Sequence, residues 1–151
     1  MVERTSVANP ALRWRRIGLD TSILIYFVQD HPRYGAWCRG LFERVERGHC
    51  SAATSTVSLL EVLVQPYRLR DDRIVNQFFA LMSTYPGFTW LPVTLEIADR
   101  AAQLRADYRL QTPDAIQVAT AIAAGAEGFL ANDSVLRRVR EIECVVLDDL
   151  L

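Results

Sequence analysis

Four acidic side chains carry the chemistry that this sequence suggests. Asp20 and Asp133 each follow closely on a short apolar run. Asp114 stands in the first turn of an expected helix, and Glu61 stands in the early turns of another. Carboxylate oxygens are preferred ligands of Mg²⁺ and Mn²⁺, and these ions promote in-line hydrolysis of phosphate esters by activating water and stabilising the leaving oxygen. The four acids therefore predict a Mg²⁺ or Mn²⁺ site that acts on phosphodiester bonds.

A cation is expected because clustered carboxylates repel one another. Two such charges about 4 Å apart repel by about 4 kcal/mol at an effective dielectric constant near 20. All seventeen basic residues of the chain are Arg and none is Lys, which also excludes Schiff-base and P-loop lysine chemistry. Pairing with Arg is an alternative, but a divalent cation is the more natural way to compensate an all-oxygen cluster.

Each acid also has an ordinary structural interpretation. Asp20 could cap a helix through its side chain, and Glu61 could close a capping box with Ser58. Asp114 could be stabilised by the helix macrodipole alone. Asp133 lies in an Asn-Asp-Ser sequence, which is a common turn composition. All four interpretations would have to hold together for the metal site to be absent.

Alternating strands and helices must position these acids. Short apolar runs predict strands at 17–19, 50–53, 88–93, 128–131 and 144–147. Apolar spacing of three and four residues predicts helices that include Ile23, Trp37, Leu59, Ile74, Ile97 and Ala115. Thr112 is expected to be the N-cap of the last of these helices and Pro113 its first residue.

This alternation indicates an α/β domain with a mainly parallel central sheet that is covered on both faces. Ligand sites of such sheets lie beyond the carboxyl ends of the strands. We therefore expect the four acids to meet at that edge.

The remaining reactive side chains have no pattern of their own. The three cysteines are widely spaced and fit no zinc motif, so Cys38, Cys50 and Cys144 are predicted to be reduced thiols. His31 and His49 have no partner at metal or triad spacing, and no Gly-x-Ser-x-Gly sequence occurs.

Charge and hydropathy suggest where the chain works. The net charge of −1 gives no overall attraction to nucleic acid, so phosphate contacts are expected from local Arg clusters at 13–16 and 137–140. Residues 1–14 contain no apolar run, and nowhere do 18 apolar residues follow one another. We therefore expect a cytoplasmic protein without a membrane span.

The pattern resembles the PIN-domain family, in particular its small VapC-type toxin branch. The resemblance spans roughly Arg16 to Leu147 and departs at Ala131, where the family often has a hydroxyl residue. It is carried by Leu19-Asp20-Thr21-Ser22, the helix with Glu61, Thr112-Pro113-Asp114-Ala115 and Phe129-Leu130-Ala131-Asn132-Asp133. It implies a PIN-like three-layer α/β/α domain over residues 16–151, with a sheet of about four to five strands, and an N-terminal extension over residues 1–15.

The same resemblance implies roles for the site residues. Asp20, Glu61, Asp114 and Asp133 would be the metal-binding acids, and Ser22 would help to hold the site. The implied activity is that of a Mg²⁺- or Mn²⁺-dependent endoribonuclease, the toxin of a type II toxin–antitoxin system. The resemblance also implies a homodimer and a small antitoxin protein whose tail fills a groove leading to the acids.

Two alternatives remain open at this point. One is a catalytically inactive PIN-like module that binds RNA or a protein, and the other is a nuclease that acts on DNA. A phosphatase of the haloacid dehalogenase type is disfavoured, because Ser22 stands where that class requires a second Asp and the chain has no lysine.

Overall fold

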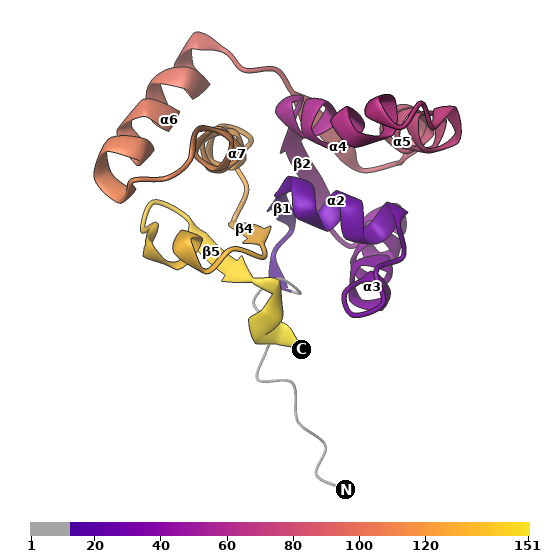
Figure 1. The fold of residues 1–151 in the computed structure, drawn as a ribbon. Coiled ribbons are helices and arrows are strands. Elements are labelled where there is room, and N and C mark those ends of the chain that lie inside the picture. The colour runs from indigo at the N-terminus through magenta and orange to yellow at the C-terminus, as the bar shows by residue number, and fades with distance from the viewer. Residues whose placement is uncertain (1–12) are drawn as a thin grey trace, which may run out of the picture.

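Five short apolar segments form one sheet in the computed structural model, which describes residues 13–151 (Figure 1). The strands are β1 (Arg16–Leu19), β2 (Ser51–Ser55), β3 (Phe88–Leu91), β4 (Gly128–Ala131) and β5 (Glu143–Val146). Their order is β3-β2-β1-β4-β5, and every pairing is parallel. The prediction of a mainly parallel sheet of four to five strands is confirmed.

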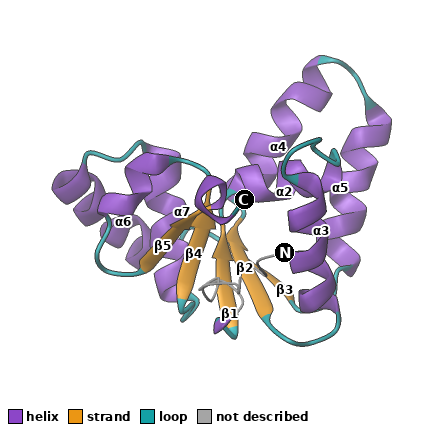
Figure 2. Cartoon of the chain, turned by 90° about the horizontal axis from the view of Figure 1, so that it is seen from below, coloured by secondary structure: helices purple, strands orange, loops and turns teal. Residues whose placement is uncertain are grey.

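Helices cover both faces of this sheet, as a parallel sheet requires. Within residues 13–151 they are α2 (Thr21–Val28), α3 (Gly35–Glu46), α4 (Val57–Arg68), α5 (Asp72–Thr84), α6 (Leu95–Tyr108) and α7 (Thr112–Ala123), with short 3-10 helices η1 (Ser134–Arg138) and η2 (Leu147–Leu150). α6 and α7 lie on one side of the strands, and α2 and α3 lie on the other (Figures 1 and 2). The three-layer α/β/α arrangement is confirmed.

The core is divided by the sheet. On one face, Leu24 and Phe42 from the helices pack with Ile17 of β1. On the other face, Leu104 of α6 packs with Phe129 of β4 and with small residues of α7. A third, smaller cluster joins α4 and α5 to α2. The four residues of β4 are all buried, which explains their unbroken apolar character.

Helix α7 lies unusually close to β1. A Cβ atom placed on Gly18 would come within 2.4 Å of the Cβ of Ala121, so no larger residue fits there without a shift. The Ala-rich composition of α7 thus permits a close approach to the central strand. This approach sets how far the first turn of α7 lies from the end of β1.

The packed domain includes Trp14, two residues before its expected start. The Trp14 side chain is 5% exposed and covers Gly128, whose added Cβ would meet the indole ring at 2.1 Å. The backbone N–H of Arg15 also donates to Oε1 of Glu127 at 2.5 Å. The rest of the expected extension, residues 1–12, lies outside the described residues.

One helix boundary was predicted wrongly. Gln111 is the N-cap of α7, and Thr112 is its first residue, with Pro113 following. Pro113 still lies in the first turn, where its missing N–H costs no hydrogen bond. As for membranes, none of the helices between residues 13 and 151 has the length and apolar composition that a bilayer span requires.

Candidate functional site

The carboxyl edge of the sheet receives acids from four segments. Asp20 is the first residue after β1, and its backbone N–H donates to the carbonyl oxygen of Leu130 in β4 at 2.9 Å. Asp133 follows the end of β4. Asp114 lies in the first turn of α7, and Glu61 is the fifth residue of α4. Strand ends and helix starts therefore place the acids on the same side of the fold.

The pKa of Asp114 is affected by the charges of the other three acids. It is raised from its ordinary value of 3.8 to about 6, first by burial and then by the negative charges of Asp20, Asp133 and Glu61. Each of these three carboxylates therefore disfavours ionisation of Asp114. The structure thus brings the four predicted residues together, while their role as metal ligands stays a prediction.

Asp20 occupies the N-cap position of α2, but its side chain makes no capping hydrogen bond to that helix. Its Oδ2 atom instead accepts a hydrogen bond from Oγ of Ser22 at 2.9 Å. Burial raises the pKa of Asp20, and the Ser22 hydroxyl opposes that shift because it stabilises the charged form. Ser22 thus contacts Asp20, as its predicted supporting role requires.

The capping-box interpretation of Glu61 is wrong. Helix α4 begins at Val57 with Thr56 as its N-cap, so Ser58 already lies inside the helix and cannot cap it. The Glu61 carboxylate turns toward α2, where its Oε1 accepts a hydrogen bond from Oγ1 of Thr21 at 2.8 Å. Glu61 is therefore tied to the helix that begins at Asp20.

For Asp133 the turn interpretation is confirmed in part. Its Oδ1 accepts the backbone N–H of Val135 at 3.0 Å and so caps η1. The same side chain raises the pKa of Asp114, as described above. Asp133 thus both caps η1 and contributes to the acidic cluster, and it is the most exposed of the four acids.

Three buried polar residues behind the acids escaped the sequence analysis. Thr21, Ser58 and Gln117 are 7%, 0% and 1% exposed, and Gln117 Nε2 donates to the hydroxyls of both others. The available signal was Gln117 itself, a single amide within the Ala-rich stretch and one helical turn after Asp114.

The donor set suits a hard divalent cation, although the acids do not surround one point. Between residues 13 and 151, no three acidic, His or Cys side chains lie close enough to enclose an ion as they stand. None of the ion pairs between described residues involves the four acids. The carboxylate repulsion is therefore not offset by a described salt bridge, and Mg²⁺ or Mn²⁺ with several retained waters fits such an open oxygen cluster.

No competing nucleophile stands out among the predicted residues. All three cysteines are free, and burial raises the pKa of Cys38 and of Cys144 to about 12, so both are protonated thiols at neutral pH. The Nδ1 atom of His31 accepts backbone N–H groups of Arg33 and Tyr34, which makes it a turn residue.

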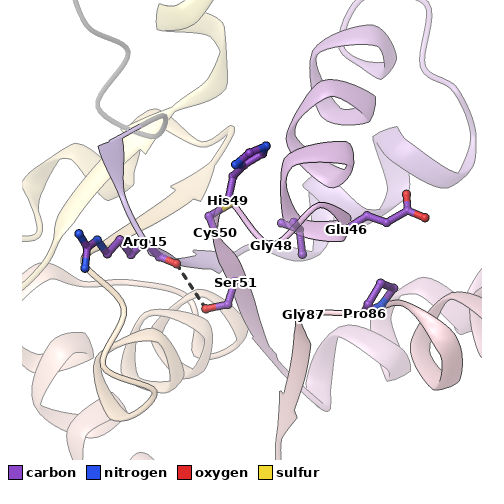
Figure 3. A pocket seen from close by; sticks show the side chains of 9 residues that line it. Arg15, Glu46, Gly48, His49, Cys50, Ser51, Pro86 and Gly87 are labelled. Carbon is purple, nitrogen blue, oxygen red and sulfur yellow. Dashed lines mark hydrogen bonds between the residues drawn. The ribbon is translucent and has the colours of Figure 1, made fainter.

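A cavity of about 530 Å³ lies at the opposite, amino-terminal edge of the sheet (Figure 3). Its lining includes Arg15, Glu46 and the exposed His49, and Ser51 Oγ donates to the Arg15 carbonyl oxygen at 3.4 Å. The charged ends of Arg15 and Glu46 point to opposite sides in Figure 3. These side chains do not converge on a common ligand position, and the cavity is not part of the acidic site.

Solved structures with a similar fold come from toxin–antitoxin complexes. VapBC2 from Rickettsia felis, bound to a promoter DNA fragment, matches with a TM-score of 0.71 and 15% identity over 87% of this chain and 98% of that chain. A toxin–antitoxin complex from Klebsiella pneumoniae matches with a TM-score of 0.63 and 22% identity over 87% and 97%. DNA-bound VapBC from Salmonella typhimurium matches with a TM-score of 0.60 and 15% identity over 88% and 98%.

The sequence was also compared with curated proteins and with protein-family models. No curated protein sequence matches the chain. The family model of the PIN domain, however, matches residues 17–142, which include the strand ends and helix starts that carry all four acids. The chain belongs to the PIN domain family.

Proposed function

We propose that this protein is a VapC-type toxin, a Mg²⁺- or Mn²⁺-dependent endoribonuclease that acts in the cytoplasm. The observation that carries the proposal is the placement of four acids at the carboxyl edge of one parallel sheet, after β1, after β4 and in the early turns of α4 and α7. The charges of Asp20, Asp133 and Glu61, which help to raise the pKa of Asp114, agree with this placement. A family fold with four acids at the carboxyl edge, and with neighbours from VapBC complexes, supports this reading.

The acids would divide the work between holding the ion and positioning water. Asp20 and Asp114 would bind the cation most directly, and Glu61 and Asp133 would complete the site or orient the attacking water. Ser22 keeps the Asp20 carboxylate in place through its hydrogen bond. When bound, the divalent ion supplies charge stabilisation for the phosphate and lowers the pKa of a water molecule. Arg side chains with their planar guanidinium groups are suited to contact the phosphate oxygens.

A small cavity beside Glu61 supports an antitoxin partner. It has a volume of about 280 Å³, and its walls come from α2, α4 and the start of α5. Apolar Ile25 and Val62 line it together with polar Gln29 and Gln65. A peptide segment with an apolar anchor fits this lining, and a basic side chain on that segment would compensate the neighbouring acids. The antitoxin would thereby compete with the cation and the RNA.

The decisive experiment compares RNA and DNA as substrates. Purified protein should cleave labelled structured RNA only when Mg²⁺ or Mn²⁺ is present, and the Asp20→Asn variant should lose at least about 100-fold in rate, as expected for a metal-bound centre. Asp107→Asn, a change of an exposed acid on α6, is the matched control and should cleave like the wild type.

The outcomes separate the proposal from its rivals. RNA cleavage that survives chelation of the metal, or that survives the Asp20 substitution, would overturn the mechanism. Preferential cleavage of DNA would identify the alternative nuclease. RNA binding without cleavage in any metal would identify the inactive binding module.

A further inference from the structure

Behind Glu61 lies a closed network of buried polar groups that joins four elements of the fold. Gln117 of α7 contacts Thr54 and Ser55 of β2, Ser58 of α4 and Thr21 of α2. All five residues are at most 7% exposed. A buried amide whose two ends are both bonded has a fixed orientation, because no water is available to replace a lost partner.

The orientation of this amide follows from the backbone of β2. The N–H of Ser55 lies 3.3 Å from one atom of the Gln117 amide, and a backbone N–H can only donate. That atom is therefore the oxygen Oε1. Thr54 Oγ1 lies 3.2 Å from it and 2.9 Å from the carbonyl oxygen of Leu19, so its one proton is shared between two acceptors. The amide nitrogen Nε2 must then face the opposite way, toward the hydroxyls of Thr21 and Ser58.

This orientation decides where the proton of Thr21 goes. Nε2 of Gln117 donates to Thr21 Oγ1 at 3.3 Å, so a lone pair of that oxygen is occupied. The hydroxyl has a single proton and two acceptors within reach, Oγ of Ser58 at 3.0 Å and Oε1 of Glu61 at 2.8 Å. The carboxylate oxygen is the nearer of the two and, when ionised, the stronger acceptor, so the proton goes to Glu61. The fixed orientation of the Gln117 amide therefore fixes the orientation of the Thr21 hydroxyl, which donates to the Glu61 carboxylate.

The Glu61 side chain has more conformational freedom to lose on ordering than the three aspartate side chains have. A glutamate side chain has three rotatable bonds, and ordering it costs more conformational entropy than ordering an aspartate. Ser22 restrains Asp20, and the capping hydrogen bond restrains Asp133. The Thr21 hydroxyl is the corresponding restraint on Glu61, and Thr21 is not itself one of the four acids.

We infer that Gln117 is a positioning residue of the acidic site, which acts through the Thr21 hydroxyl to hold the Glu61 carboxylate ready for the cation. The inference rests on the proposed function, because it gives Glu61 a part in binding the metal. A purely structural role would be different: the network would only tie α7 to β2 and α4, and its loss would lower stability without changing metal affinity.

The first test replaces Thr21 and follows Mn²⁺ binding by the EPR signal of the free ion. Thr21→Val keeps the shape of the side chain but removes the hydroxyl, and it should raise the Kd for Mn²⁺ by roughly 10-fold or more. Thr21→Ser keeps the hydroxyl and should bind Mn²⁺ within about twofold of the wild type. RNA cleavage at subsaturating Mg²⁺ should follow the same order.

The matched control is Thr120→Val, on the same helix as Gln117. Thr120 is also fully buried, but its hydroxyl donates only to the Ile116 carbonyl oxygen of its own helix, at 2.7 Å. This variant removes a buried hydroxyl that has no contact with Glu61, so it should keep the wild-type Kd for Mn²⁺, and its Tm is measured beside that of Thr21→Val. Comparison with Thr21→Val therefore separates loss of stability from loss of positioning.

A second variant reverses the hydrogen bond without changing the shape. Gln117→Glu replaces the donating Nε2 by an acceptor, so the Thr21 proton is drawn toward residue 117 and away from Glu61. Weaker Mn²⁺ binding is expected from this variant as well. If Gln117→Glu does not fold, Gln117→Met takes its place, because it removes the Nε2 donor without adding a charge, and it should weaken Mn²⁺ binding in the same way.

The results distinguish failure of the positioning role of Gln117 from failure of the proposed function. If the wild type binds Mn²⁺ and cleaves RNA while Thr21→Val equals it, or Thr120→Val loses as much affinity, the positioning role is overturned and the proposed function stands. If the wild type neither binds Mn²⁺ nor cleaves RNA, the proposed function fails and the positioning role fails with it.

Discussion

At the scale of single residues, Asp114 shows what the acidic cluster costs the folded protein. Its pKa in the folded state, about 6, lies above the ordinary value of 3.8. The folded state therefore binds this proton more tightly than the unfolded state does. The resulting contribution to stability is present below about pH 4 and is lost as the pH rises through about 6. Above that pH, ionised Asp114 destabilises the metal-free fold.

Asp114→Asn should therefore stabilise the metal-free protein. At pH 7.5 in chelator-treated buffer we expect a gain of about 1–2 kcal/mol, or roughly 2–6 °C in Tm, reduced somewhat by loss of an acid at the start of α7. The gain should shrink toward zero near pH 4, where the wild-type side chain is protonated. Thermal melts across this pH range, with Asp107→Asn as an exposed control, measure it. A lower Tm for Asp114→Asn at pH 7.5 would contradict the electrostatic account.

Mg²⁺ should raise the Tm of the wild type more than the Tm of the Asp114→Asn variant. Mg²⁺ stabilises only a fold that binds it, so the Tm of the wild type should rise with Mg²⁺ concentration. The Asp114→Asn variant lacks one of the proposed ligands and should respond less. The same melting experiment, repeated over a Mg²⁺ titration, checks this expectation. Equal responses of both proteins would remove Asp114 from the metal site.

Some of the site was readable from the sequence because its signals are local. Asp20 and Asp133 follow apolar runs, and Asp114 follows a Thr-Pro helix start, so each is marked by its immediate neighbours. The partner of Glu61 was not readable. Its hydrogen bond to Thr21 joins residues forty positions apart and depends on how α2 packs against α4. Local reasoning offered only the nearby Ser58 as an alternative partner.

At the scale of elements, the contact between β1 and α7 sets the site. Gly18 and Ala121 meet so closely that a single added methyl group would force the helix away from the strand. The apolar run at 17–19 predicted the strand, but neither this run nor the Ala-rich composition of α7 could specify which residue faces Gly18. Burial of Trp14 against Gly128 was missed for the same reason. Both contacts depend on register, which is set only when the sheet is assembled.

Gly18→Ala should disturb stability and metal binding together. Overpacking at this contact is expected to cost about 1–3 kcal/mol, and the displaced α7 would carry Asp114 away from Asp20. The double variant Gly18→Ala with Ala121→Gly removes the clash and should recover much of the loss, less about 1 kcal/mol for a glycine within a helix. Denaturant unfolding and Mn²⁺ binding of the single and double variants test this. If the double variant recovers neither stability nor Mn²⁺ binding, the contact between residues 18 and 121 does not set the distance between β1 and α7.

At the scale of the whole molecule, an exposed apolar stripe suggests that the chain works as a pair. Leu60, Val64 and Tyr67 follow one another at helical spacing along α4 and are 65%, 38% and 58% exposed. The N–H of Thr56 at the start of α4 donates to Leu91 at 3.0 Å, so the chain that leads to the 92% exposed Leu95 leaves from beside this helix. Exposed apolar surface of this kind marks an interface. We expect a second copy of the chain to cover it.

Charged substitutions on this stripe should separate the two copies. Light scattering should give twice the monomer mass for the wild type and the monomer mass for Leu60→Arg with Tyr67→Arg. Phe79→Arg, a change of an apolar side chain that is 46% exposed on α5, is the control and should remain dimeric. An unchanged mass in the double variant would assign the stripe to another partner, and loss of antitoxin binding would then identify that partner.

The strand order also governs when the site can exist. β1 pairs with β4, which is made much later, and Asp114 and Asp133 come from the last third of the chain. A nascent chain therefore carries Asp20 and Glu61 well before their partners have been translated. Because β4 cannot reach β1 until it has emerged from the ribosome, the four acids cannot meet before β4 and Asp133 have been translated. A nascent chain that lacks β4 would therefore lack any activity that needs all four acids together.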